Sequence, residues 1–143
     1  MNIIKQALQV MESEFTQADW TLNKSELAKD FCRLQIGAEK DEVFSVLFLD
    51  NHNCKLDFKT FFHGTINECN IYLRPIVRHG LEINAAKVIL VHNHPSGNCT
   101  PSDADVALTR EFKTVLDKLQ LKLIDHIIVS PTGTASLCEL GMI

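Results

Sequence analysis

The stretch VILVHNHPSGNCTPSDAD, residues 88–105, constrains the fold more than any other part of the chain. Its first four residues are a short apolar run, which is typical of a buried strand. Pro95 has no amide hydrogen and should end the strand's hydrogen bonding, and Gly97 allows the chain to turn. Ser102 then begins an amphipathic helix. A strand, a loop and a helix in this order favour an α/β fold with a site at the strand end.

Three side chains in this stretch have the chemistry of metal ligands. Residues two apart in an extended chain point the same way, so His92 and His94 should face one point in space. Asp105 lies in the first turn of the following helix. Two imidazoles and one carboxylate, with a fourth position for water, form the ligand set of a catalytic zinc site.

The same residues also support a purely structural interpretation. Ser102 and Asp105 have the S-x-x-D spacing of a helix capping box. An aspartate that reaches back to cap the helix would not be a free ligand in that geometry, although Ser102 can cap while Asp105 points at a metal. The H-x-H pair alone is a weak signal, because two histidines can share a polar loop by chance.

Glu42 is the candidate for proton transfer to and from a metal-bound water. It begins the apolar run EVFSVLFLD, in which a carboxylate is otherwise unfavourable. The alternative is that Glu42, next to Asp41, marks only the polar end of that strand.

The remaining pattern predicts alternating helices and strands around a mixed sheet. Two helices are expected in the first 36 residues, the second ending at Gly37. Strands are expected at 42–50, 55–62, 87–91, 127–129 and 135–137, and helices at 74–84 and 102–121. With 143 residues and no visible linker, we expect one domain over residues 1–143.

Composition argues against a disulfide-rich protein, a secreted or membrane protein, and a nucleic-acid-binding protein. The five cysteines are odd in number and form no C-x-x-C pair, which disfavours a disulfide framework and a thiolate zinc site and fits a cytoplasmic protein. The opening residues lack a signal-peptide core, and no apolar run reaches membrane-spanning length. The net charge of −4 argues against a nucleic-acid footprint, and acidic neighbours dilute Lys113, Lys118 and Lys122.

Two levels of resemblance follow from these motifs. An upstream glutamate, H-x-H, ten residues from Pro95 to Ala104, and an aspartate preceded by Ser102 resemble the JAMM (JAB/MPN+) metalloprotease motif. More narrowly, HNHPSG, PSDAD, LIDHIIVS, FLDNHN and FHGT resemble the bacterial RadC family over about residues 25–143.

The resemblance implies a three-layer α-β-α fold related to the cytidine deaminases. It implies one zinc ion on His92, His94 and Asp105 with water as fourth ligand. It also implies Glu42 as the acid/base residue and Ser102 as a donor that stabilises the tetrahedral intermediate. Similar proteins outside the RadC branch cleave isopeptide bonds, so a peptide or protein substrate is expected.

The chain departs from the RadC pattern in two places. Too few residues precede Glu42 to hold the helix-hairpin-helix, a DNA-binding element of typical RadC chains. Leu137 stands where an aromatic residue is expected, which concerns packing. The first departure favours a zinc hydrolase over a DNA-repair accessory protein that binds nucleic acid through the same fold. A nucleoside deaminase is excluded because H-x-E and P-C-x-x-C are missing.

The other polar residues near these motifs are expected to be structural. His52 and His63 should be solvated, His126 should open a strand and form a hydrogen-bonded pair with Asp125, and Cys99 should be a small loop residue. Asn93 and Ser96 should face away from the two imidazoles if the strand geometry persists.

Overall fold

A five-stranded mixed sheet forms the centre of the computed structural model, which describes residues 2–15, 22–66 and 70–143. The strand order is β2-β1-β3-β4-β5. The strands are β1 (Val43–Leu49), β2 (Lys55–His63), β3 (Lys87–Asn93), β4 (Lys122–Ser130) and β5 (Gly133–Ser136). The helices are α1 (Ile3–Phe15), α2 (Leu22–Ile36), α3 (Leu73–Glu82) and α4 (Asp103–Lys118).

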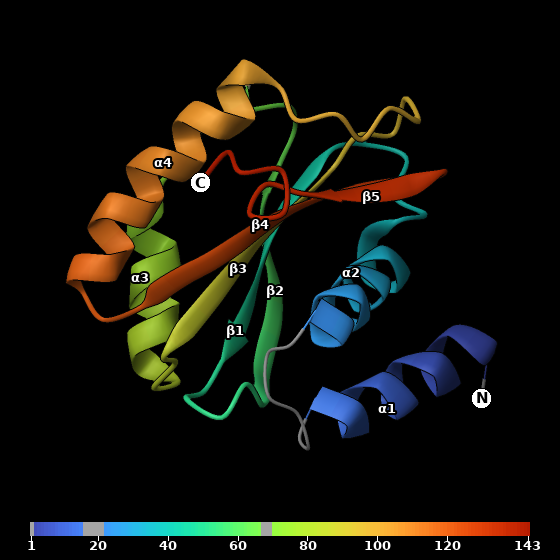
Figure 1. Cartoon of the computed structure of the whole chain (residues 1–143), viewed down its shortest axis with the longest axis horizontal. Coiled ribbons are helices and arrows are strands. Elements are labelled where there is room, and N and C mark those ends of the chain that lie inside the picture. The colour runs from blue at the N-terminus through green and yellow to red at the C-terminus, as the bar shows by residue number, and fades with distance from the viewer. Residues whose placement is uncertain (1, 16–21, 67–69) are drawn as a thin grey trace.

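The helices cover both faces of the sheet, so the fold is the expected α/β fold with three layers (Figure 1). Helices α3 and α4 lie on one face, and α1 and α2 lie on the other. Strand β1 is buried along its whole length because its side chains alternate between two apolar cores. Phe44, Val46 and Phe48 pack toward α3 and α4, whereas Leu47 and Leu49 pack toward α2.

Strand β3 lies at the centre of the sheet and determines where the candidate site is. It pairs antiparallel with β1 and parallel with β4, and α4 makes the crossover between the two parallel strands. The carboxyl end of β3 and the first turn of α4 therefore meet at one edge of the sheet, a common place for a binding site in α/β proteins.

Several boundaries differ from the sequence prediction by one or two residues, and two differ by more: the start of β4 and the end of α4. Strand β4 begins at Lys122 rather than at residue 127, because its polar residues are buried and hydrogen-bonded, Asp125 to Ser136 of β5 and His126 to Thr109 of α4. Helix α4 ends at Lys118 rather than at residue 121, since Gln120 has a φ of 61° and leaves the helical conformation. Within the described part of the chain, no helix has the length and apolarity to cross a membrane.

Candidate metal centre

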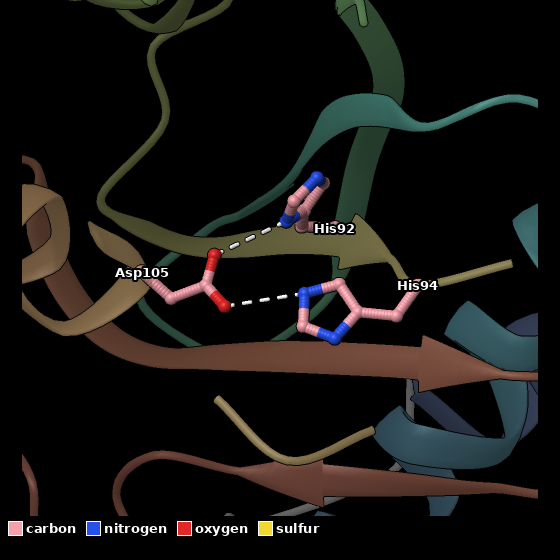
Figure 2. Close-up of side chains that lie close together, drawn as sticks. All are labelled: His92, His94 and Asp105. Carbon is pink, nitrogen blue, oxygen red and sulfur yellow. Dashed lines mark hydrogen bonds and ion pairs between the residues drawn. The ribbon is translucent and has the colours of Figure 1, made fainter. Parts of the chain in front are cut away.

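His92, His94 and Asp105 converge at the edge of the sheet where β3 ends (Figure 2). His92 is the sixth residue of β3, and His94 follows directly after the strand, where its backbone N–H still donates to the carbonyl of Val129. Asp105 comes from the first turn of α4. Both imidazoles point to one side, as the two-residue spacing predicts, and face the Asp105 carboxylate.

The Asp105 carboxylate contacts both imidazoles from a fully buried position. His92 Nδ1 lies 3.2 Å from its Oδ1, and His94 Nε2 lies 3.2 Å from its Oδ2. One potential ligand atom from each residue lies within 4.8 Å of those of the other two. This group of two histidines and one aspartate could therefore bind a metal ion.

Capping of α4 and contact with the histidines, treated above as alternatives for Asp105, occur together. The Ser102 hydroxyl accepts from the Asp105 backbone N–H at 3.0 Å, and Asp105 Oδ2 accepts from the Ser102 backbone N–H at 2.8 Å. The capping box is therefore complete. A carboxylate has several acceptor positions, so one N–H bond leaves the Asp105 oxygens able to face His92 and His94. The cap fixes the orientation of the carboxylate.

The hydrogen atoms on the imidazole rings show why a cation fits this site. The backbone carbonyl of Asn98 lies 3.0 Å from His94 Nδ1, and a carbonyl only accepts, so Nδ1 carries a hydrogen. In a neutral ring, His94 Nε2 then directs a lone pair at Asp105. Only a second proton or a metal ion makes that contact attractive. The contact with Asp105 accordingly raises the pKa of His94.

His92 has a carboxylate beside each of its ring nitrogens, and in a neutral ring only one of the two nitrogens carries a hydrogen. Its Nδ1 faces Asp105, and its Nε2 lies 3.4 Å from Glu42 Oε2. Among the described residues, this buried Nε2 has no hydrogen-bond partner. Burial raises the pKa of Asp105, but bonds from His92, His94 and the Ser102 backbone outweigh it and hold that pKa well below its usual range. The buried carboxylate thus stays charged and available to a cation.

Glu42 and Ser102 lie on the rim of the same cavity, which has a volume of about 430 Å³. Glu42 directly precedes β1, and 23% of its side chain is exposed. The cavity is lined by Glu42, Thr65, Ile66, His92, His94, Ser96, Asn98, Thr100, Ser102, Ala104 and Asp105. The structure therefore brings together all five residues that the sequence singled out.

Behind Asp105, Thr109 and His126 form a hydrogen-bonded pair that the sequence pattern does not predict. Thr109 donates its hydroxyl hydrogen to the Asp105 carbonyl at 2.6 Å, and His126 Nδ1 lies 2.6 Å from the same hydroxyl oxygen. Because that oxygen has donated its own hydrogen, His126 must be the donor in the second bond. His126 and Asp125 form the expected hydrogen-bonded pair through the His126 backbone N–H, which donates to Asp125 Oδ1 at 2.7 Å, while their side chains point to opposite faces of the strand. Burial lowers the pKa of His126 to about 3.

The other expectations for polar residues have mixed outcomes. His52 and His63 are exposed, as expected. Ser96 is expected to face away from the imidazoles only if the strand continues; β3 ends at Asn93, and Ser96 lines the cavity together with His92 and His94. Cys99 is half-buried and does not belong to the ligand group found among the described residues.

Comparison with known proteins assigns the fold and the motif to one family. The family model of the RadC-like JAB domain matches residues 22–142. A UPF0758 protein of Vibrio cholerae serotype O1 is 37% identical over 97% of this chain and 87% of its own length. UPF0758 proteins of Verminephrobacter eiseniae and Polaromonas sp. are 44% and 41% identical, each over 80% of this chain. The chain spans 48% and 51% of the length of these two proteins. The chain thus belongs to the RadC family, in which residues 22–142 form the RadC-like JAB domain.

Proposed function

We propose that this chain is a zinc-dependent hydrolase that cleaves the amide bond of a peptide or isopeptide substrate. The observation that carries the proposal is the convergence of His92, His94 and Asp105 on a cavity whose rim holds the Glu42 carboxylate, 3.4 Å from His92 Nε2. Three protein ligands with a carboxylate beside them are the arrangement of catalytic zinc sites, in which one coordination position is left open.

Zinc is the metal that the donor set favours. Imidazole nitrogen suits zinc, copper, iron and nickel, whereas magnesium and calcium take oxygen ligands almost exclusively. Two histidines and one carboxylate match the ligands of known catalytic zinc sites. The Asn98 carbonyl holds the hydrogen of His94 on Nδ1, which leaves Nε2 as the atom that would bind the ion.

The side chains around this site would divide the steps of hydrolysis between them. A bound zinc ion supplies Lewis acidity, which makes hydroxide available near neutral pH. Glu42 would take the proton of the attacking water and return it to the leaving amine. The Ser102 hydroxyl accepts from a backbone N–H, so its own hydrogen remains available to donate to the oxyanion of the tetrahedral intermediate.

The family supports the proposed substrate class, and the cysteines support the proposed cellular compartment. JAB domains are often hydrolytic, and a peptide or protein substrate fits an open, polar cavity on the edge of a sheet. Cys32, Cys99 and Cys138 are free thiols. Free thiols are typical of a reducing compartment, so we propose that the protein acts in the cytoplasm.

Removal and return of the metal test the proposal. The protein would be stripped with a chelator, reloaded with one equivalent of zinc, and incubated with quenched-fluorescence libraries of peptides and of isopeptide-linked peptides. We expect cleavage only by the reloaded protein, and at least about a 100-fold loss in Ser102→Ala, the usual cost of removing one oxyanion donor. Cleavage by the stripped protein, or none by zinc-loaded protein across both libraries, would contradict the proposal.

A further inference from the structure

The backbone around Glu42 is held by the side chain of Asn93, the residue between the two histidines. The backbone ladder between β1 and β3 ends with the pair Phe44 and His92, so Asn93 lies opposite Val43 at the next position. Asn93 Oδ1 accepts the Val43 backbone N–H at 2.6 Å, and Asn93 Nδ2 donates to the Asp41 carbonyl at 3.0 Å. The amide thus continues the ladder by one step and bonds to the residues on both sides of Glu42.

A third hydrogen bond holds the same segment from the neighbouring strand. The Gly64 backbone N–H, just beyond β2, donates to the Glu42 carbonyl at 2.8 Å. The backbone of Glu42 is therefore held from β3 on one side and from the end of β2 on the other. Its side chain is directed toward His92 Nε2 and into the cavity.

The position of Asn93 explains why an amide is suited to this role. Asn93 is 2% exposed and lies on the same strand face as Ile89 and Val91, which pack toward α2. A buried side-chain amide on an apolar face is costly unless its donor and acceptor are both bonded. Asn93 satisfies both by bonding one N–H and one carbonyl of the same short segment. Aspartate has the same shape but lacks the N–H that the Asp41 carbonyl requires.

We propose that Asn93 is a positioning residue for Glu42, and that the H-N-H segment places both the metal ligands and the proton-transfer carboxylate. The histidine side chains face the site from one side of β3, and the asparagine fixes the backbone of Glu42 from the other side. The proposal rests on the proposed function for the role of Glu42. Its hydrogen bonds are properties of the fold and can be tested without any substrate.

The test compares Asn93→Ala and Asn93→Asp with Ser45→Ala as a matched control. Ser45 is a buried residue of β1, three positions after Glu42, and its hydroxyl forms a 2.7 Å hydrogen bond with Thr60 Oγ1. It takes no part in the hydrogen bonds that hold the backbone of residues 41–43. Zinc content, hydrogen exchange of the Val43 amide and the shift of the Glu42 carboxyl carbon resonance on zinc addition would be measured in each. Hydrolysis would be measured with and without Glu42→Gln.

We expect all three variants to keep about one zinc per chain, the stoichiometry of a single three-ligand site. Asn93→Ala should speed exchange of the Val43 amide about tenfold, the factor for one ordinary hydrogen bond. It should also weaken the Glu42 response to zinc. Hydrolysis should fall about 100-fold, as for a small displacement of a reacting group, and this loss should disappear in the Glu42→Gln background. Asn93→Asp should show the same pattern, and Ser45→Ala should match the parent protein.

Two results would overturn the role of Asn93. One is wild-type Val43 exchange and a wild-type Glu42 response in Asn93→Asp and in Asn93→Ala. The other is an equal loss of hydrolysis with and without Glu42→Gln, which would mean that Asn93 acts through general stability. If the wild-type protein with zinc hydrolyses nothing, the proposed function fails, and the amide exchange and the Glu42 resonance still decide whether Asn93 holds Glu42.

Discussion

The two ends of strand β3 are both polar, but their polar groups are arranged in opposite ways. At its start, Lys87 Nζ donates to Asn53 Oδ1 at 2.6 Å, so donor meets acceptor. At its far end, ring nitrogens of His92 and His94 face carboxylate oxygens at 3.2–3.4 Å, and each ring, when neutral, directs one lone pair at a carboxylate, so acceptor meets acceptor at one contact of each ring. The first end is complete without a ligand, whereas the second becomes favourable only with protons or a cation.

If the larger cavity were taken as the functional site, the Lys87 end of β3 would be chosen instead of the His92 end. The cavity beside Lys87 has a volume of about 570 Å³ and the one beside His92 about 430 Å³. Near Lys87, the Asp50 carboxylate accepts the backbone N–H groups of His52 and Cys54 and so stabilises the turn between β1 and β2. Polar groups that satisfy one another stabilise a fold, whereas unsatisfied groups that converge on a cavity are candidates for a binding site.

The largest expected effect separates the two ends by their zinc content. His92→Ala and Asp105→Ala should reduce bound zinc from about one per chain to near zero, because each removes one of three ligands. Lys87→Ala, at the other end of the same strand, should keep the full content, as should His52→Ala and His126→Ala. The measurement is elemental analysis of protein purified without chelator. Full zinc content in His92→Ala would refute the ligand assignment.

The second prediction separates metal binding from proton transfer at the carboxyl end of β3, where His92 and His94 lie. Glu42→Gln keeps the size of the side chain but removes its basicity, so zinc content and folding should be unchanged. Hydrolysis should fall about 10²–10⁴-fold, the usual contribution of general acid–base catalysis. Initial rates on a cleaved library member would measure it. An active Glu42→Gln variant would assign Glu42 only the role of a polar strand end.

The candidate ligands could be predicted from the sequence because their pattern is local. His92, His94 and Asp105 lie within fourteen residues, and Ser102 with Asp105 has a recognisable capping spacing. Asn93 was assigned no role, because its bond to Val43 spans 50 positions. The only sequence feature that points to a role for Asn93 is the two-residue period of the strand, which places its polar amide on the same face as Ile89 and Val91. The start of β4 was misplaced because buried Asp125 and His126 interrupt an otherwise apolar run.

The third prediction concerns the hydrogen bond between Thr109 and His126, which lies behind Asp105. Thr109→Val keeps the shape of the side chain but leaves His126 Nδ1 buried with no acceptor from residue 109. The free energy of unfolding should fall by about 1–3 kcal/mol, the usual cost of an unsatisfied buried group, with zinc content unchanged. Urea unfolding of the zinc-loaded protein would measure it. Unchanged stability would show that the bond between Thr109 and His126 contributes nothing to the fold.

The fourth prediction is a smaller, pH-dependent effect of the same pair. Burial lowers the pKa of His126 from 6.5 to about 3. As the pH falls below about 6.5, the unfolded chain takes up a proton on His126 that the folded protein refuses until near pH 3, so stability decreases across this window. His126→Gln should reduce this slope by at most about 1.4 kcal/mol per pH unit. Identical slopes in both proteins would contradict the buried neutral state of His126.

The smallest expected effect is binding of DNA. Lys87 is bonded to Asn53, and the chain carries a net charge of −4. Non-specific DNA affinity comes mainly from phosphate neutralisation, so we expect binding weaker than the usual ~10⁻⁴–10⁻⁶ M at physiological salt. Titration of labelled duplex and single strand across salt would measure it. Micromolar binding that weakens steeply with salt would favour the nucleic-acid accessory function.

Anomalous diffraction at the zinc edge from zinc-loaded crystals tests the central claim most directly. We expect one anomalous peak per chain, within about 2.0–2.2 Å of one atom each of His92, His94 and Asp105, the usual zinc distances to nitrogen and oxygen. Glu42 should lie within hydrogen-bond reach of the open position and should not be a ligand. A peak at the Lys87 end, or a Glu42 carboxylate bound directly to the ion, would contradict this assignment of the two ends of β3.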